Sequence, residues 1–322
     1  MRTQSYRYLG FVIESELPLA VSPAPVSAPA ELSVTLCSGS PPVVGSDAEL
    51  IALRRGAAPY EAWRTGRGFV LQIGDAATLV VQPSLTEATV YPREVSDEVL
   101  SLLVMGLGFA FWLGLRGELV LHASATVGAD GRAVIAPGAS GAGKSTLAGL
   151  LCACGRTLLA DDAVRVARSG SEWLAHGGAR ELRLRADAGR MNELFGRAPT
   201  RRSADGRWAL APPATADGCG TLQHLVFPRI RPTLEPHAKR LTPAAALVEL
   251  LRGMRFGAWL AGGVQENQVR GLAELARTVP AYEVSLPRAA ALDFERARQA
   301  HDWTVGLGPG DDEASRELRS HP

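Results

Sequence analysis

The sequence has few cysteines, no excess of either charge and no uninterrupted apolar N-terminus. Four cysteines in 322 residues are too few and too scattered for a disulfide scaffold, which favours a reducing compartment. Lysine and arginine number 34 against 33 acidic residues, so no bulk field attracts nucleic acid or an anionic membrane. Glu14 and Glu16 interrupt the stretch that a signal peptide needs to be apolar. We therefore expect a cytoplasmic protein that binds neither nucleic acid nor membrane.

One uncharged stretch, residues 99–115, is long enough to challenge that expectation. It lies between Glu98 and Arg116, and its length is at the lower limit of a membrane-spanning helix. A serine and three glycines dilute its apolar character, so we favour a buried core helix over a membrane span. The composition, 46% hydrophobic and 21% charged, is that of a folded globular chain.

The N-terminal part of the chain reads as a β-rich module. Short runs rich in β-branched residues are separated by glycine, proline, aspartate and serine, and they lie at 31–36, 68–73, 77–82 and 87–92. We expect three parts in the chain: this module at 1–93, an α/β domain at 94–303 and a polar tail at 304–322.

The α/β prediction rests on the order of segments after residue 118. Strands at 119–127 and 132–136 flank a Gly-Ala-Asp-Gly turn. A glycine-rich loop, a helix that Gly155 ends and a strand at 157–160 follow. Farther along, the sequence predicts a helix that begins at Thr242 and ends at Gly253, a helix at about 265–278 and a strand at 282–286.

Residues 138–145 match the phosphate-loop pattern G-x-x-x-x-G-K-S/T. Composition alone predicts roughly 0.002 such matches in the chain, and Lys144 is one of only two lysines. Glycines let successive N–H groups point at a polyphosphate beside the start of a helix. Lys144 would reach the β- and γ-phosphates, and the Ser145 hydroxyl would ligate Mg²⁺. The alternative is a glycine-rich turn with an unrelated lysine. The expected nucleotide-binding residues are Gly138, Ala139, Ser140, Gly141, Ala142, Gly143, Lys144, Ser145 and Thr146.

Two adjacent carboxylates, Asp161 and Asp162, directly follow the strand at 157–160. The carboxyl ends of strands are where open α/β sheets bind ligands. One acid at such a place holds Mg²⁺, and a second can accept the proton of an attacking hydroxyl as a general base. We expect the pair to serve both tasks, without a division of roles between them; the alternative is that one of them only caps a turn.

His122 and a group of arginines are the remaining polar residues of interest. His122 is flanked by apolar residues, and from this alone a core histidine is favoured over a functional one. Eight arginines either clamp a phosphate or an acidic substrate, or form a solvated face; they are Arg180, Arg183, Arg185, Arg190, Arg197, Arg201, Arg202 and Arg207.

Taken together, LVLHASATV, GASGAGKST and LLADD resemble the catalytic domain of the HPr kinase/phosphorylase family. The resemblance is closest to HPr-kinase-related proteins found beside peptide-modifying enzymes in bacterial gene clusters, including lasso-peptide clusters. It is specific over about 119–166 and weaker to Arg288. It implies a P-loop, HPr-kinase-like α/β core in which His122 lies near the transferring phosphate. It also implies that Lys144 binds phosphate and that Ser145, Asp161 and Asp162 serve Mg²⁺ and the substrate hydroxyl.

Two departures from the bifunctional members of that family change the expected substrate. Ala123 stands where those enzymes have glycine, and their Glu-Ile-Arg-Gly signature is absent, residues 181–186 being the nearest stretch. The resemblance therefore does not imply dephosphorylation, nor HPr as the substrate.

The sequence thus predicts an ATP- and Mg²⁺-dependent kinase that phosphorylates a serine hydroxyl of a peptide or protein, such as a ribosomally made lasso-type precursor peptide. Two alternatives are a small-molecule kinase acting on free serine and a non-catalytic ATP-binding sensor or scaffold. The second aspartate argues against the sensor, because binding alone needs one metal-holding acid. Both a monomer and a homo-oligomer agree with the sequence.

Overall fold

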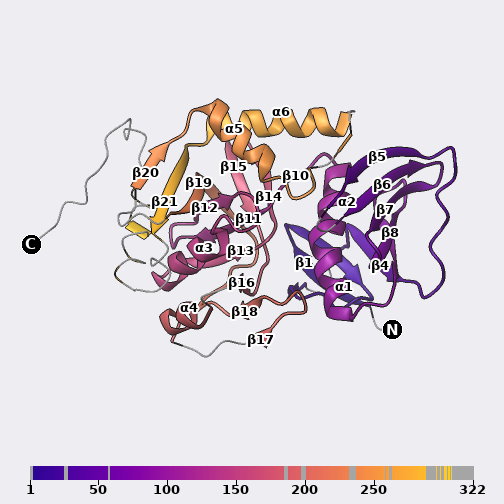
Figure 1. Cartoon of the computed structure of the whole chain (residues 1–322), viewed down its shortest axis with the longest axis horizontal. Helices are drawn as coiled ribbons and strands as arrows, with labels where there is room; N and C mark the ends of the chain where they lie inside the picture. The colour runs from indigo at the N-terminus through magenta and orange to yellow at the C-terminus, as the bar shows by residue number, and fades with distance from the viewer. Residues whose placement is uncertain are drawn as a thin grey trace, which may run out of the picture. The chain divides into compact units, whose positions relative to one another are not determined.

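The structure, a computed structural model, describes residues 3–24, 28–56, 59–184, 188–196, 201–231, 237–257, 259–260, 263–287, 295, 298, 301, 302, 304 and 306. Within these residues the chain is mixed α/β, with large β-sheets and few helices (Figure 1). Contacts divide the chain into two compact units, unit 1 with residues 1–120 and 255–271 and unit 2 with residues 121–254 and 272–322. The sequence analysis placed the helical segment at 97–115 in the α/β domain that begins at residue 94. In the structure this segment groups with the N-terminal strands in unit 1.

Unit 1 is built on one sheet, which has nine strands in the described residues, in the order β3-β1-β2-β4-β9-β8-β7-β6-β5. Neighbouring strands are antiparallel except for β2 with β4 and β4 with β9, which are parallel. The four runs predicted as strands are confirmed as β4, β7, β8 and β9. The strands are β1 (Gln4–Tyr8), β2 (Phe11–Ser15), β3 (Ser22–Pro23), β4 (Leu32–Leu36), β5 (Glu49–Arg54), β6 (Tyr60–Thr65), β7 (Gly68–Ile73), β8 (Ala77–Val81) and β9 (Glu87–Pro92).

The uncharged stretch forms a helical segment in unit 1 made of α1 (Asp97–Leu103), the π-helical turn η1 (Val104–Gly108) and α2 (Phe109–Leu115). Trp112 packs edge-on against Phe11 of β2, with ring centroids 5.2 Å apart, and its indole N–H donates to the Leu85 carbonyl at 2.7 Å. Among the described helices this segment is apolar and long enough to cross a membrane, yet 67% of its most apolar window is buried. The structure therefore agrees with the predicted core helix.

The main sheet of unit 2 contains the strands that lead to the glycine-rich loop. Strands β11 (Ala123–Val127) and β12 (Arg132–Pro137) form the predicted antiparallel hairpin. The predicted strand at 119–127 is wrong in one respect, because it breaks at His122 and leaves β10 (Leu119–Leu121) as a separate strand. The His122 N–H donates to the Gly253 carbonyl at 2.6 Å, and its carbonyl accepts from the Gly138 N–H at 3.2 Å. These bonds take the histidine backbone out of the ladder.

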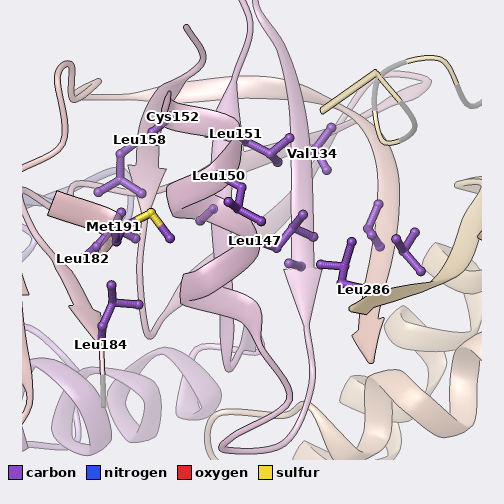
Figure 2. Close-up of a cluster of buried hydrophobic side chains, with 14 of the residues drawn as sticks. Val134, Leu147, Leu150, Leu151, Cys152, Leu158, Leu182, Leu184, Met191 and Leu286 are labelled. Carbon is purple, nitrogen blue, oxygen red and sulfur yellow. The ribbon is translucent and has the colours of Figure 1, made fainter. Parts of the chain in front are cut away.

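The glycine-rich loop leads from β12 into α3 (Lys144–Ala153), which is followed by β13 (Thr157–Ala160). Strand β11 lies between β12 and β13 and is antiparallel to both, so β12 and β13 are parallel. Figure 2 shows Leu147, Leu150 and Leu151 of α3 within a cluster of buried apolar side chains. The helix, its end before Gly155 and the strand after it are as predicted.

The rest of unit 2 extends this sheet and adds a smaller one. From β14 on, the described strands of the main sheet follow the order β14-β15-β19-β12-β11-β13, with β21 parallel to β19 and β20 antiparallel to β21. A three-stranded sheet has the order β16-β18-β17. The bounds are β14 (Val164–Ser169), β15 (Glu172–His176), β16 (Leu182–Leu184), α4 (Ala188–Leu194), β17 (Arg201–Arg202), β18 (Trp208–Leu210), β19 (Cys219–Arg231) and β20 (His237–Arg240).

The C-terminal elements confirm the predicted two helices and strand. Helix α5 (Pro243–Arg252) begins after Thr242, whose hydroxyl accepts from the Ala245 N–H at 3.3 Å, and it ends at Gly253. Helix α6 (Gly263–Thr278) and strand β21 (Ala281–Pro287) follow.

Gly177 allows its segment to pass close to β13, the strand that ends just before the two aspartates, because it has no side chain. A Cβ at Gly177 would overlap the Leu159 carbonyl, which already accepts from the Gly178 N–H at 2.8 Å. We expect Gly177→Ala to lower the free energy of unfolding by about 1–3 kcal/mol, because neither backbone segment can yield cheaply. Urea unfolding measures this loss. Gly66→Ala is the control, since nothing lies within 4 Å of its Cβ position; equal stability of the two variants would contradict the prediction.

Candidate functional site

The glycine-rich loop, residues 138–143, connects β12 to the N-terminus of α3. Gly141 and Gly143 have φ of +87° and +98°, in the left-handed region that glycine adopts without strain. Gly253 lies against the start of the loop, where a Cβ on it would be 3.0 Å from the Gly138 nitrogen. Gly143 is the N-cap of α3 and offers no side-chain acceptor to the first N–H groups of the helix, so an anion can occupy that place. Thr146 follows in the first turn of α3.

Lys144 is the first residue of α3, and its side chain folds back onto the loop. Its ammonium donates to the Ala139 carbonyl at 2.8 Å, and the residue is only 6% exposed. A cation at a helix N-terminus is unfavourable because the helix dipole is positive there, and burying the charge adds a desolvation cost. The arrangement is therefore one that an anion beside the loop would stabilise.

Asp161 lies directly after β13 and faces the glycine-rich loop. Its Oδ1 accepts from the Ser145 hydroxyl at 2.8 Å and from the Ser124 hydroxyl at 2.6 Å. Its Oδ2 accepts from the backbone N–H of Arg183 at 2.8 Å. The structure thus brings together the serine of the loop motif and the first aspartate.

Asp162 contacts different side chains from Asp161. Its φ of +80° is uncommon for a residue other than glycine. Its Oδ1 lies 3.3 Å from His122 Nδ1, and its Oδ2 lies 3.0 Å from the guanidinium of Arg183. His122 Nδ1 also lies 3.0 Å from the Asp162 carbonyl oxygen; a carbonyl only accepts, so this nitrogen carries the proton. His122 therefore contacts the second aspartate of the candidate site.

The oxygens of Ser145 and Asp161 fit a magnesium ion. Mg²⁺ prefers hard oxygen ligands and is usually held by one or two carboxylates together with substrate phosphates and waters. The described residues contain no group of three or more histidines, cysteines, aspartates or glutamates placed to hold a metal, so an ion here would depend on phosphate and water for its other ligands. Asp162, which the sequence also suggested as a metal ligand, is paired with Arg183 and His122.

Arg183 is the arginine of this stretch that contacts both aspartates of the candidate site in the described residues. Its side chain is 15% exposed and lies between Asp162 and Asp205, whose Oδ2 is 3.4 Å from it. Burial acts to raise the pKa of Asp205, but its bond from Ser203 and the charges of Arg183 and Arg207 outweigh this and lower the pKa. Asp205 therefore remains anionic near neutral pH and holds the guanidinium in place.

Other arginines of the stretch have partners in or near the three-stranded sheet. Arg201 pairs with Glu181 at 2.9 Å, and the guanidinium of Arg202 lies 4.3 Å from the centroid of the Trp208 ring. Arg185 and Arg197 lie outside the described residues. Within the described residues Arg183 thus contacts the candidate site through Asp162, whereas Arg202 is exposed.

Two site residues, Ser124 and Gly253, were missed by the sequence analysis. Ser124 did carry a usable signal: it lies two residues after His122, and alternate residues of a strand share a face. Gly253 was assigned only the end of a helix, and its contact with Gly138 depends on tertiary structure.

No protein-family model matches the chain, and a search of curated proteins found no match either.

Proposed function

We propose that this chain is an ATP- and Mg²⁺-dependent kinase with an HPr-kinase-like core that transfers the γ-phosphate to a serine hydroxyl of a peptide or protein. The observation that carries this is the 2.8 Å hydrogen bond between Ser145 and Asp161. A glycine-rich turn could match the loop motif by accident. A motif serine bonded to an acid at the end of a nearby parallel strand is the arrangement by which phosphate-loop enzymes hold Mg²⁺.

Nucleotide binding uses the loop amides, the N-terminus of α3 and Lys144. The N–H groups donate to phosphate oxygens, while Lys144 exchanges the Ala139 carbonyl for a phosphate oxygen. A phosphate oxygen is charged and the Ala139 carbonyl is neutral, so the exchange adds the attraction of opposite charges to the hydrogen bond. When bound, Mg²⁺ neutralises charge on the β- and γ-phosphate oxygens. Ser145 and Asp161 are the residues that would hold it.

The second aspartate is then available as the general base. Asp162 lies outside the Ser145 contact and is oriented by His122 and Arg183. It accepts the proton of the acceptor hydroxyl while that oxygen forms its bond to the γ-phosphorus and the bond from phosphorus to the ADP oxygen breaks. The geometry thus favours Asp161 for the metal and Asp162 for the proton, a division that the sequence left open.

Phosphoryl transfer to separate acceptor classes tests the proposal. The full chain is incubated with [γ-³²P]ATP and Mg²⁺, in one set of reactions with serine-containing peptides, including a lasso-type precursor peptide, and in another with free serine. Labelled phosphoserine in a peptide, abolished by EDTA, is the expected result. Label on free serine alone would indicate the small-molecule kinase, and Mg-ATP binding without transfer would indicate a sensor. No binding of Mg-ATP would refute the proposal altogether.

A further inference from the structure

The residues at the start of β11 supply one contact to each of the two aspartates. His122 comes directly before β11, and Ser124 is the second residue of that strand. His122 contacts Asp162 through Nδ1, and the Ser124 hydroxyl donates to Asp161 Oδ1 at 2.6 Å. The segment that begins β11 therefore contacts both carboxylates.

Ser124 lies in a strand with paired neighbours on both sides. It is 1% exposed and is paired with Ala136 of β12, while the next residue, Ala125, is paired with Ala160 at the end of β13. A residue in a strand with neighbours on both sides keeps its place when the glycine-rich loop rearranges around a phosphate. Its hydroxyl is therefore placed to keep its contact with Asp161 when a nucleotide binds.

Ser145 differs from Ser124 in this respect. Both hydroxyls donate to the same oxygen of Asp161, but Ser145 is a proposed ligand of Mg²⁺ and must reorient its oxygen to serve as one. The bond from Ser124 and the bond from the Arg183 N–H then keep the carboxylate in its orientation. Groups that orient a metal ligand in this way typically contribute 10- to 100-fold to metal affinity.

We propose that Ser124 is a positioning residue that orients the Asp161 carboxylate for Mg²⁺. This inference rests on the proposed function, because it requires the metal and the nucleotide to bind at the loop.

Magnesium titrations of nucleotide binding test the role of Ser124 apart from catalysis. Binding of a non-hydrolysable ATP analogue to the full chain is followed by calorimetry, first in EDTA and then at increasing Mg²⁺. We expect Ser124→Ala to raise the half-saturating Mg²⁺ concentration about tenfold and to leave the affinity in EDTA unchanged. Ser124→Thr keeps the hydroxyl and is expected to restore the wild-type value. Ser124→Cys, of similar size and with a weaker donor, should give an intermediate value and replaces the alanine variant if that variant does not fold.

Thr126 provides the matched control on the same strand. It is equally buried, and its hydroxyl accepts from the Arg156 side chain at 3.0 Å. Thr126→Val removes a buried hydroxyl outside the site, so its half-saturating Mg²⁺ concentration should equal that of the wild type. An unchanged value in Ser124→Ala, or an equal rise in Thr126→Val, would overturn the role of Ser124 and leave the kinase proposal standing. Absence of Mg²⁺-dependent analogue binding in the wild type would overturn both.

Discussion

Asp162→Asn is expected to slow phosphoryl transfer about 10²- to 10⁴-fold, the usual contribution of a general base, while Mg-ATP still binds. Asparagine keeps the size of the side chain and also tolerates the left-handed backbone at this position, so the fold is retained. Its amide cannot take a proton from the acceptor hydroxyl. The contacts of Ser145 with Asp161 are untouched by the change, which is why nucleotide affinity should stay within a few-fold of wild type. Single-turnover transfer from [γ-³²P]ATP to the acceptor used by the wild type measures the effect.

Asp205→Asn is the matched control for this variant. Asp162 and Asp205 each place one carboxylate against the guanidinium of Arg183, so both variants remove one charge from the same arginine. Only Asp162 contacts His122 among these two. We expect Asp205→Asn to keep a transfer rate within a few-fold of wild type. Equal losses in the two variants would assign the effect to Arg183 and would remove Asp162 from the role of base.

The loop and the elements around it could be predicted because their signals are local. Apolar residues at helical spacing after Lys144, the capping residues Thr242 and Gly253 and the β-branched runs of unit 1 each depend on neighbours within a few positions. The position of Asp161 near the loop could be predicted from its neighbours in the same way, because an acid that directly follows a strand lies at the carboxyl edge of the sheet.

The partners of the two aspartates could not be predicted in the same way. The two aspartates are adjacent in sequence, yet their carboxylates contact different side chains, and the backbone at Asp162 is left-handed. No sequence pattern predicts this conformation. Arg183 reaches the site from a segment 21 residues farther along, because β16 passes beside the end of β13. In sequence it was one arginine among eight, and two others, Arg201 and Arg202, contact Glu181 and Trp208 instead.

The grouping of the chain into units also depends on long-range packing. Residues 255–271 join unit 1, where Phe256 stacks on Tyr60 of β6 with ring centroids 4.5 Å apart. Trp259 stacks on Phe111 of α2 at 5.7 Å. Aromatic residues at these positions could pack against many different partners. The sequence therefore does not show that residues 255–271 return to unit 1 before the rest of unit 2 follows.

Lys144→Ala is expected to lower kcat/KM for phosphoryl transfer about 10²- to 10³-fold or more, the cost of removing one preorganised group that stabilises charge in the transition state. Alanine is a good helix former, and loss of a cation from the first turn of α3 removes an unfavourable interaction with the helix dipole, so the fold should persist. Transfer kinetics and analogue affinity measure the effect, and urea unfolding checks the fold.

The second lysine of the chain provides the control for Lys144. Lys239 lies on β20 and is exposed, so Lys239→Ala removes the same charge from a surface position and should leave kcat/KM unchanged. Full transfer activity in Lys144→Ala, or an equal loss of activity in Lys239→Ala, would contradict the role of Lys144 in phosphate binding.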